Sequence, residues 1–392
     1  MSAEPTVAVQ SCDTYDRDAV EASVRACLAA IGGLDSFVRP GDRVFCKVNL
    51  LISPPRRDHA ITTHPEVVRA IIHEVRRVGA VPLVSDNPAL KISKTMLKNS
   101  GILPVLEEEK VEAPDLSETV EIANPAGRAF KSFRVSKAIA EADVLLNLPK
   151  VKTHALTYMS GAVKNLFGLI PGTAKASWHL QAPAPELFAS CICDLYGAVL
   201  GHFGGERRML HLSDGILAME GDGPGAGGRP RQLGALLASA DAVALDRVTC
   251  AIVGLDPERN LIVREAARRG MGEGDLSRIR WTGAPAEHWS GVRFEPPPGS
   301  IRETTLTRRL MGSPWLKNRL LNRPLLDHEK CNGCQKCKQI CPADAIAVAG
   351  EPIMPQFFLS SCIRCYCCAE VCPEGAIRKS AVPVLGRLLR LS

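Results

Sequence analysis

The sequence predicts an α/β domain with a mostly parallel, doubly wound sheet, followed by a small cysteine-rich α+β domain. Two observations lead to this fold class. Apolar segments of strand length alternate with segments of helical periodicity over the first 290 residues, a pattern typical of βαβ units. Nine of the fifteen cysteines then lie between residues 331 and 372. We expect the α/β domain at 1–290, a connector at 291–325, the cysteine-rich domain at 326–380 and a basic amphipathic tail at 381–392.

The secondary-structure elements follow from apolar periodicity and from residues typical of helix ends and turns. The helix that begins at His64 has Pro65 and Glu66 in its first turn, and Gly79 ends it. A turn at 213–215 and a glycine-rich loop at 219–228 precede the last strand. We expect strands at 7–9, 43–48, 81–84, 143–148, 208–212 and 233–239, a hairpin at 120–123 and 130–135, and helices at 17–30, 64–78, 186–200 and 241–253.

The cysteine-rich region contains the frame Cys-x-x-Cys-x-x-Cys-x-x-x-Cys-Pro twice. One copy begins at Cys331 and the other begins 31 residues later, at Cys362. Two such copies are the bacterial ferredoxin pattern for two 4Fe-4S clusters, in which the fourth cysteine of each copy ligates the other cluster. We therefore expect a ferredoxin-like iron–sulfur domain with one cluster held by Cys331, Cys334, Cys337 and Cys372 and the second by Cys341, Cys362, Cys365 and Cys368.

The other cysteine arrangements leave alternatives. Zinc also binds Cys-x-x-Cys pairs, but it needs four ligands per ion and has no use for a doubled Cys-Pro frame. Cys367 lies between ligands and outside the frame, so it is a bystander thiol or an alternative ligand. Cys191 and Cys193 are two small buried hydrophobic residues, or else a redox pair or cluster ligands.

Composition restricts the class of protein. Apolar residues make up 46% and charged residues 23% of the 392, which is ordinary for a globular chain. The net charge of +6 is mild and its basic residues are scattered, so no nucleic-acid partner is expected. We see no signal peptide and no run of 18 apolar residues, so we expect no transmembrane segment. Clusters of this kind favour a reducing compartment, and we expect the protein to be cytoplasmic.

Polar residues follow four of the expected strands. Lys47 and Asn49 end one strand, and Asp86 ends the next. Because ligands of open α/β sheets bind outside the carboxyl ends of the strands, we expect these side chains to converge on one cleft. The same reasoning places Asn147, Lys150 and Asp214 at that edge of the sheet.

Several segments resemble the family known as domain of unknown function 362. The resemblance covers roughly residues 40–285, and fusion to a ferredoxin unit is familiar in that family. It implies an iron–sulfur protein that reduces a small organic substrate, and it draws attention to Lys152, His154 and Lys164. The matching segments are 47–50, 62–68, 143–154, 161–168, 214–224 and 240–246.

The polar residues suit an anionic ligand. Several lysine ammonium groups around one cleft favour a carboxylate, a phosphate or a quinone that gains electrons. Imidazole titrates near neutral pH, so the histidines are the expected proton donors. We assign catalytic roles to His154, Lys152, Lys164, His64 and Lys47, and substrate contacts to Asn49, Asp86, Asn147, Lys150, Asn165, Asp214, Glu220 and Asp222.

Two interpretations of the acidic residues are open. Asp214, Glu220 and Asp222 carry oxygen ligands that suit a divalent cation such as magnesium. Alternatively, Asp214 caps a turn and the glycine run is a mobile lid over the cleft.

The sequence thus favours an iron–sulfur oxidoreductase. An external donor, a ferredoxin, a flavodoxin or a reductase, supplies electrons through the two clusters to a small anionic, quinone-like or carbonyl-like substrate. Two alternatives remain: an electron-transfer protein whose large domain docks a partner enzyme, and a factor that matures a cofactor or metal centre.

Overall fold

The structure, a computed structural model, describes residues 4–51, 60–90, 94–298 and 322–379. A nine-stranded sheet has the order β11-β1-β10-β9-β6-β2-β3, and β7 and β8 continue it from β9. Five strand pairs are parallel and three are antiparallel, so the predicted, mostly parallel sheet is confirmed. The strands are β1 (Thr6–Ser11), β2 (Arg43–Lys47), β3 (Val81–Ser85), β6 (Val144–Asn147), β7 (Lys150–His154), β8 (Tyr158–Ser160), β9 (Met209–Gly221), β10 (Gly228–Ser239) and β11 (Arg280–Gly283).

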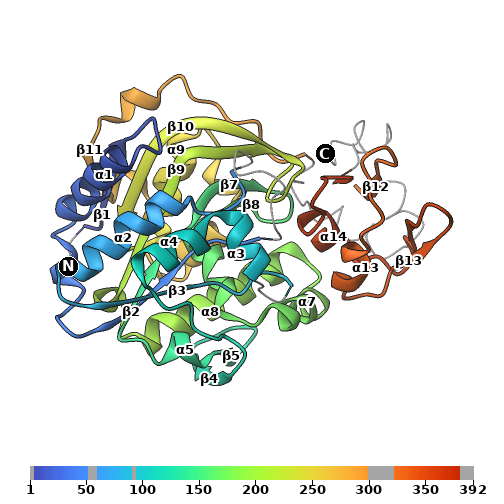
Figure 1. Cartoon of the computed structure of the whole chain (residues 1–392), viewed down its shortest axis with the longest axis horizontal. Helices are drawn as coiled ribbons and strands as arrows, with labels where there is room; N and C mark the ends of the chain where they lie inside the picture. Colours follow the sequence, from blue (N-terminus) through green and yellow to red (C-terminus); the bar gives the residue numbers. More distant parts are fainter. Residues whose placement is uncertain (1–3, 52–59, 91–93, 299–321, 380–392) are drawn as a thin grey trace.

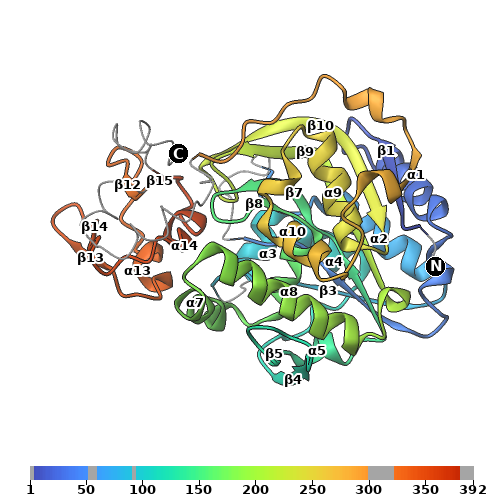
Figure 2. The ribbon, with the colours of Figure 1, turned by 180° about the vertical axis from the view of Figure 1, so that it is seen from behind.

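Helices cover both faces of this sheet. Val7 and Val9 pack into one core, whereas Ala8 between them packs into the core on the opposite face, as strand alternation requires. Helices α1 (Arg17–Ala30), α2 (Pro65–Arg77) and α4 (Ile102–Glu109) lie in front in Figure 1, and α8 (Pro185–His202), α9 (Ala242–Ile252) and α10 (Leu261–Arg268) lie in front in Figure 2. The shorter helices are α3 (Lys94–Ser100), α5 (Lys137–Ala140), α6 (Ala162–Asn165) and α7 (Gly172–Gln181).

The expected turn at 213–215 is wrong, because strand β9 continues through these residues. It pairs with β10 in an antiparallel hairpin that extends from His211 opposite Ser239 to Gly221 opposite Gly228. A bulge near Gly234, which has a φ of +67°, shifts the register and allows the ladder to continue. The glycine-rich segment is therefore the tip of a long hairpin. In Figure 1 this tip extends towards the small domain.

Two cysteines outside the repeat, Cys191 and Cys193, lie on helix α8. Cys191 and Cys193 are both buried in the core beneath the sheet. Burial raises the pKa of each thiol to about 12, so both are protonated at neutral pH. Their placement fits the interpretation as small hydrophobic residues.

A buried carboxylate fixes the hairpin of β4 (Thr119–Ala123) and β5 (Ser132–Ser136) to α8. Asp194 is fully buried and accepts hydrogen bonds from the backbone N–H groups of residues 128–130, at 2.7–2.9 Å. Its other partner is the Arg269 guanidinium, at 2.6 Å. The hairpin therefore depends on one charged side chain of a distant helix.

Replacing Asp194 with alanine is expected to lower the free energy of unfolding by about 3–5 kcal/mol, because it leaves Arg269 and three N–H groups unpaired. Urea denaturation would measure the loss. Glu118→Ala is the control, since Glu118 forms an exposed ion pair with Lys137 and its loss should leave the urea midpoint almost unchanged. Equal losses in the two variants would contradict this account.

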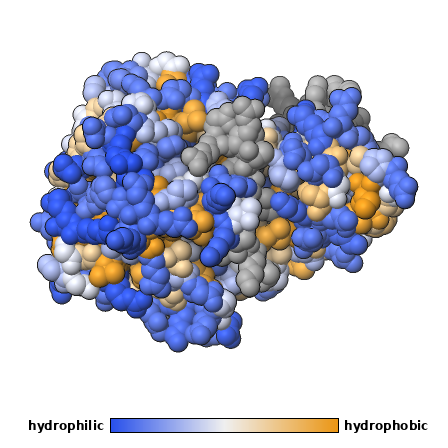
Figure 3. Space-filling model, viewed as in Figure 1, coloured by the Kyte–Doolittle hydropathy of each residue, from blue (hydrophilic) through white to orange (hydrophobic). Residues whose placement is uncertain are grey.

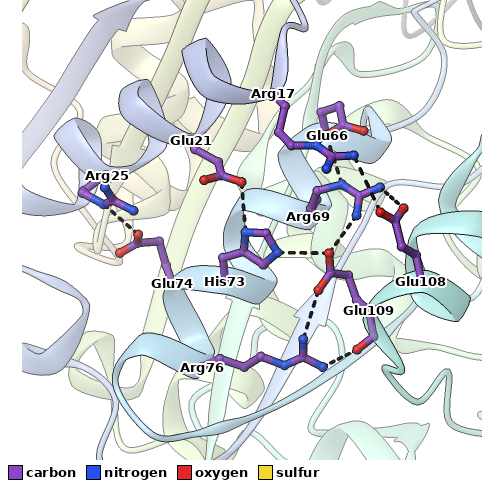
Figure 4. A network of polar contacts seen from close by, with 10 residues as sticks. All are labelled: Arg17, Glu21, Arg25, Glu66, Arg69, His73, Glu74, Arg76, Glu108 and Glu109. Carbon is purple, nitrogen blue, oxygen red and sulfur yellow. Dashed lines mark hydrogen bonds and ion pairs between the residues drawn. The ribbon is translucent and has the colours of Figure 1, made fainter.

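An ion-pair network joins the helices of the front face (Figure 4). Arg69 of α2 donates to Glu66 at 3.1 Å and to Glu108 and Glu109 of α4 at 2.7 Å each. Glu109 also contacts His73, and these contacts lower its pKa. Hydrophilic residues correspondingly cover α1 and α2 on the face shown in Figure 3. We interpret this network as structural, because none of its residues lines the cleft described below.

The small domain repeats one short unit twice. Helix α13 (Lys336–Ile340) and strands β13 (Ile346–Ala349) and β14 (Met354–Phe357) are followed by α14 (Cys367–Glu370), and β12 (Pro324–Leu326) pairs with β15 (Ile377–Lys379). Figure 1 shows this domain beside the α/β domain, with α14 turned towards it. Ile340, Cys367 and Val371 share a core with the large domain. No helix in the described residues is long and apolar enough to cross a membrane. Most of the expected connector and all of the tail lie outside the described residues.

Candidate functional site

A cleft of about 710 Å3, partly open to solvent, lies between the two domains. It is located at the carboxyl ends of β2 and β3, where the sequence placed it. Both domains form its walls, because α13 and α14 of the small domain close the side opposite the sheet. The predicted residues in its lining are Lys47, Asn49, Asp86, Lys152, His154, Lys164 and Asn165, and the small domain adds Ile340, Cys367 and Glu370.

A buried ion pair forms the base of the cleft. Lys47 ends β2, and its Nζ lies 2.6 Å from Asp86 Oδ1, just beyond β3. Asn165 Oδ1 accepts from Asn49 Nδ2 at 2.8 Å. A side chain at Gly168 would collide with the pair, since its Cβ would lie 2.4 Å from Lys47 Nζ. The base is therefore fixed and almost neutral.

Three further ammonium groups surround this base without a carboxylate partner. Lys152 Nζ donates to the Ile61 carbonyl at 2.7 Å, and Lys175 donates to the Asn87 carbonyl. Lys164 Nζ lies 4.9 Å from the centre of the Phe167 ring. In the described chain, no carboxylate oxygen lies within 4.0 Å of these three groups, whereas Lys47 and Lys150 do form ion pairs. The cleft therefore carries unbalanced positive charge.

Burial makes two of these lysines titrate near neutral pH. The pKa of Lys152 is lowered to about 7 by burial and also by the neighbouring Lys164 ammonium. The pKa of Lys175 is lowered to about 7 by burial, with repulsion from Lys47 and Lys164. A buried lysine near its pKa gives up a proton readily, so these two groups are suited to proton transfer.

Of the two predicted histidines, His154 lines the cleft but is kept neutral by burial, whereas His64 lies outside the lining. His154 Nδ1 accepts from the Leu156 N–H at 3.1 Å, which places the ring proton on Nε2, 3.3 Å from Glu370 Oε1. Burial and the neighbouring Lys164 hold the pKa of His154 well below its usual value, so this ring is neutral. His64 lies outside the cleft lining; its Nδ1 caps α2 by accepting from the Glu66 N–H at 3.2 Å.

A carboxylate that the sequence analysis did not select fixes helix α6, which carries Lys164 and Asn165. Asp246 is buried in α9 and accepts from the Ala162 and Val163 N–H groups at 2.5 and 3.1 Å. Burial raises the pKa of Asp246 to about 7. Gly161 permits this contact, because its Cβ would lie 2.2 Å from the carboxylate. Asp246 thus positions two residues of the cleft.

Six predicted residues lie outside the lining of the cleft. His64 caps a helix, and Asn147 supports α6 from below by donating to the Ala162 carbonyl at 2.9 Å. Lys150 and Asp214 form a buried ion pair of 2.7 Å. The other two acidic residues have partners elsewhere: Glu220 accepts from the Glu295 N–H at 3.0 Å, and Asp222 from the Lys379 N–H at 3.3 Å. The three carboxylates therefore do not gather around one cation.

The sequence analysis also missed residues of the cleft. Lys175 and His179 come from α7, a segment without a clear apolar stripe, and Glu370 comes from the other domain. His179 stacks on Phe188 with 4.5 Å between ring centres, and burial lowers its pKa to about 3. Lys175 is the only Asp, Glu, Lys or Arg between Lys164 and Glu186, so the sequence around it gives no local signal of a site.

The cysteines of the small domain line two separate cavities. One, of about 380 Å3, contains Cys331, Cys334, Cys337 and Cys372. The other, of about 360 Å3, contains Cys341, Cys362, Cys365 and Cys368, together with Cys367. Each cavity thus contains the four cysteines predicted for one cluster, contributed by both copies of the repeat, and four thiolates are the donor set of a 4Fe-4S cluster.

Comparisons with known proteins agree with this architecture. Residues 44–251 match the family described as domain of unknown function (DUF362), and residues 323–373 match a 4Fe-4S dicluster domain. A thylakoid-associated protein of Synechocystis sp. is 37% identical over 259 residues, which are 64% of this chain and 75% of the relative. The lactate racemase apoprotein from Thermoanaerobacterium thermosaccharolyticum is 13% identical, with a TM-score of 0.42, and the match covers 64% of this chain and 57% of that protein.

Proposed function

The chain belongs to the DUF362 family, and we propose that it is an iron–sulfur oxidoreductase that reduces a small anionic, quinone-like or carbonyl-like acceptor in the cleft between its domains. Cys331, Cys334, Cys337 and Cys372 would hold one 4Fe-4S cluster, and Cys341, Cys362, Cys365 and Cys368 a second. These clusters supply one-electron transfers from an external carrier. The match to a 4Fe-4S dicluster domain supports iron–sulfur binding, and the two four-cysteine cavities support the count of two.

One observation carries the proposal: the lysine-rich cleft is shared by both domains. Lys152 and Lys164 face it from the large domain, and Cys367 and Glu370 face it from the small one. A ligand in the cleft would therefore lie next to the segment that holds two cysteines of the second cavity. A domain that only docked a protein partner would not need buried ammonium groups here.

Different side chains of the cleft stabilise negative charge and donate protons. Lys164 attracts the negative charge that develops as the acceptor gains electrons. Lys152 and Lys175 donate protons, and the neutral Nε2–H of His154 orients Glu370 at the domain junction. A quinone or an enone would gain two electrons, one at a time, and two protons, so the reaction balances with a one-electron carrier as the reductant.

The test uses anaerobically reconstituted full-length protein with dithionite as the reductant. We expect about eight irons and eight sulfides per chain, and reoxidation of the reduced clusters by some members of a panel of quinones, 2-oxo acids and enoates. The carrier function would be favoured instead if none of these acceptors reoxidised the clusters while a ferredoxin exchanged electrons equally fast with the wild type and with a Lys152→Met/Lys164→Met variant.

A further inference from the structure

The two copies of the cysteine repeat differ at the positions that contact the large domain. A shift of 31 residues superimposes the cysteines of the two copies but pairs Lys336 with Cys367, Gln339 with Glu370, and Val348 with Lys379. At these three positions the second copy therefore carries a thiol, a carboxylate and an ammonium group, where the first copy carries an ammonium group, an amide and an apolar side chain.

Two of these side chains, Glu370 and Lys379, contact the large domain directly. Glu370 Oε1 lies 3.3 Å from His154 Nε2, and Lys379 Nζ donates to the Ala155 carbonyl at 3.0 Å. The backbones also meet closely, since a Cβ at Gly225 would lie 2.8 Å from the Glu370 carbonyl oxygen. The second copy therefore makes the polar contacts of the junction, to which the first copy adds the apolar side chain of Ile340.

Cys367 occupies a special place in this arrangement. Among the described residues, it is the one that lines both the lysine-rich cleft and the cavity of Cys341, Cys362, Cys365 and Cys368. Its side chain shares the wall of the second cavity with Cys365, two residues away in the chain. The other four-cysteine cavity shares no residue with the cleft, and its Cys334 is exposed. The cavity of Cys341, Cys362, Cys365 and Cys368 therefore adjoins the cleft, whereas the other cavity does not and has an exposed cysteine in its wall.

We propose that the two clusters act in a fixed order and that Cys367 is the positioning residue between the second cluster and the substrate. Cys331, Cys334, Cys337 and Cys372 would hold the cluster that takes electrons from the external carrier. Cys341, Cys362, Cys365 and Cys368 would hold the cluster that supplies them to a ligand in the cleft. This inference rests on the proposed function, because it assumes that both clusters are present.

Cys367 would act through the neighbouring Cys365 thiolate when that thiolate ligates the cluster. A hydrogen bond to a cluster thiolate stabilises the more negative, reduced state and raises the reduction potential. Because Cys367 lines both the cavity of Cys365 and the cleft, its thiol would be placed to donate such a bond to the Cys365 thiolate and also to contact a ligand in the cleft. At the equivalent position of the other copy, Lys336 does not line the cleft. The second cluster is thus tuned separately from the first.

The experiment compares Cys367→Ala with Lys336→Ala, its repeat-related control, by EPR-monitored redox titration of the reconstituted full-length protein. We expect wild-type iron content in both variants. Cys367→Ala should shift one of the two midpoint potentials to a more negative value. If Lys336→Ala changes a midpoint potential at all, it should change the other one. Cys367→Ser, which keeps a hydrogen-bond donor, should restore much of the wild-type potential.

Inorganic phosphate, as an anionic probe of the cleft, should perturb only the potential that Cys367→Ala shifts. The inference is overturned if Cys367→Ala shifts neither potential, if both variants shift the same one, or if Cys367→Ala loses iron as a ligand replacement would. These outcomes are distinct from failure of the proposed function, which would show as fewer than about eight irons in the wild-type protein.

Discussion

Replacing Lys164 with methionine is expected to slow reduction of the acceptor by about 10²–10³-fold while both clusters stay in place. Lys164 lies in the cleft beside Glu370 and the Phe167 ring, and no carboxylate in the described chain pairs with it directly. Its charge is therefore free to stabilise the anion that forms on electron transfer. Methionine keeps the length and packing of the side chain but removes that charge.

Stopped-flow reoxidation of dithionite-reduced protein by an acceptor from the panel would measure this effect. Lys98→Met is the matched control, because Lys98 is exposed on α3 and does not line the cleft. Lys164→Met should bind as much iron per chain as the wild type and should unfold at the same urea concentration. An unchanged rate in Lys164→Met would remove the main electrostatic role that we give to the cleft.

Local sequence signals predicted the elements that position this site. The apolar runs that became β2 and β6 identify strands buried on both faces. Strand direction then placed Lys47 and Asp86 at one edge, where the structure brings them together in an ion pair. The prediction worked here because both signals, burial and strand polarity, are contained in short segments.

The rest of the site depends on contacts between distant segments. Ser213, Asp214 and Gly215 are typical turn residues, yet pairing with β10 and the buried Lys150 hold this segment as a strand. Glu370 belongs to the small domain, and no local pattern relates it to His154. Histidine was chosen as the proton donor from its ordinary pKa, which burial changes.

The depressed pKa values of Lys152 and Lys175 predict an unusual pH dependence. Both ammonium groups attract the acceptor and donate protons, and both are lost as the pH rises through about 7. We expect the second-order rate constant for acceptor reduction to be level below about pH 7 and to fall above it, approaching a hundredfold decrease per pH unit because two protons are required.

Lys175→Met isolates the contribution of one group. It should lower the rate at pH 6 and reduce the decrease above pH 7 to about tenfold per unit, because only Lys152 then titrates. A profile that stays level to pH 9 in the wild type would contradict proton donation by these lysines. The acceptor should itself carry no group that titrates between pH 6 and 9.

A measurement without any acceptor checks the same two groups. Lysine in an unfolded chain has a pKa of about 10.4, whereas these lysines lose their protons near 7 in the folded protein. Between these values the unfolded state binds more protons than the folded state, so the free energy of unfolding should increase with pH. Each lysine contributes a slope of about 1.4 kcal/mol per pH unit. Lys152→Met and Lys175→Met should each remove one such contribution, and an unchanged slope would mean that the cleft lysines titrate as ordinary surface lysines do.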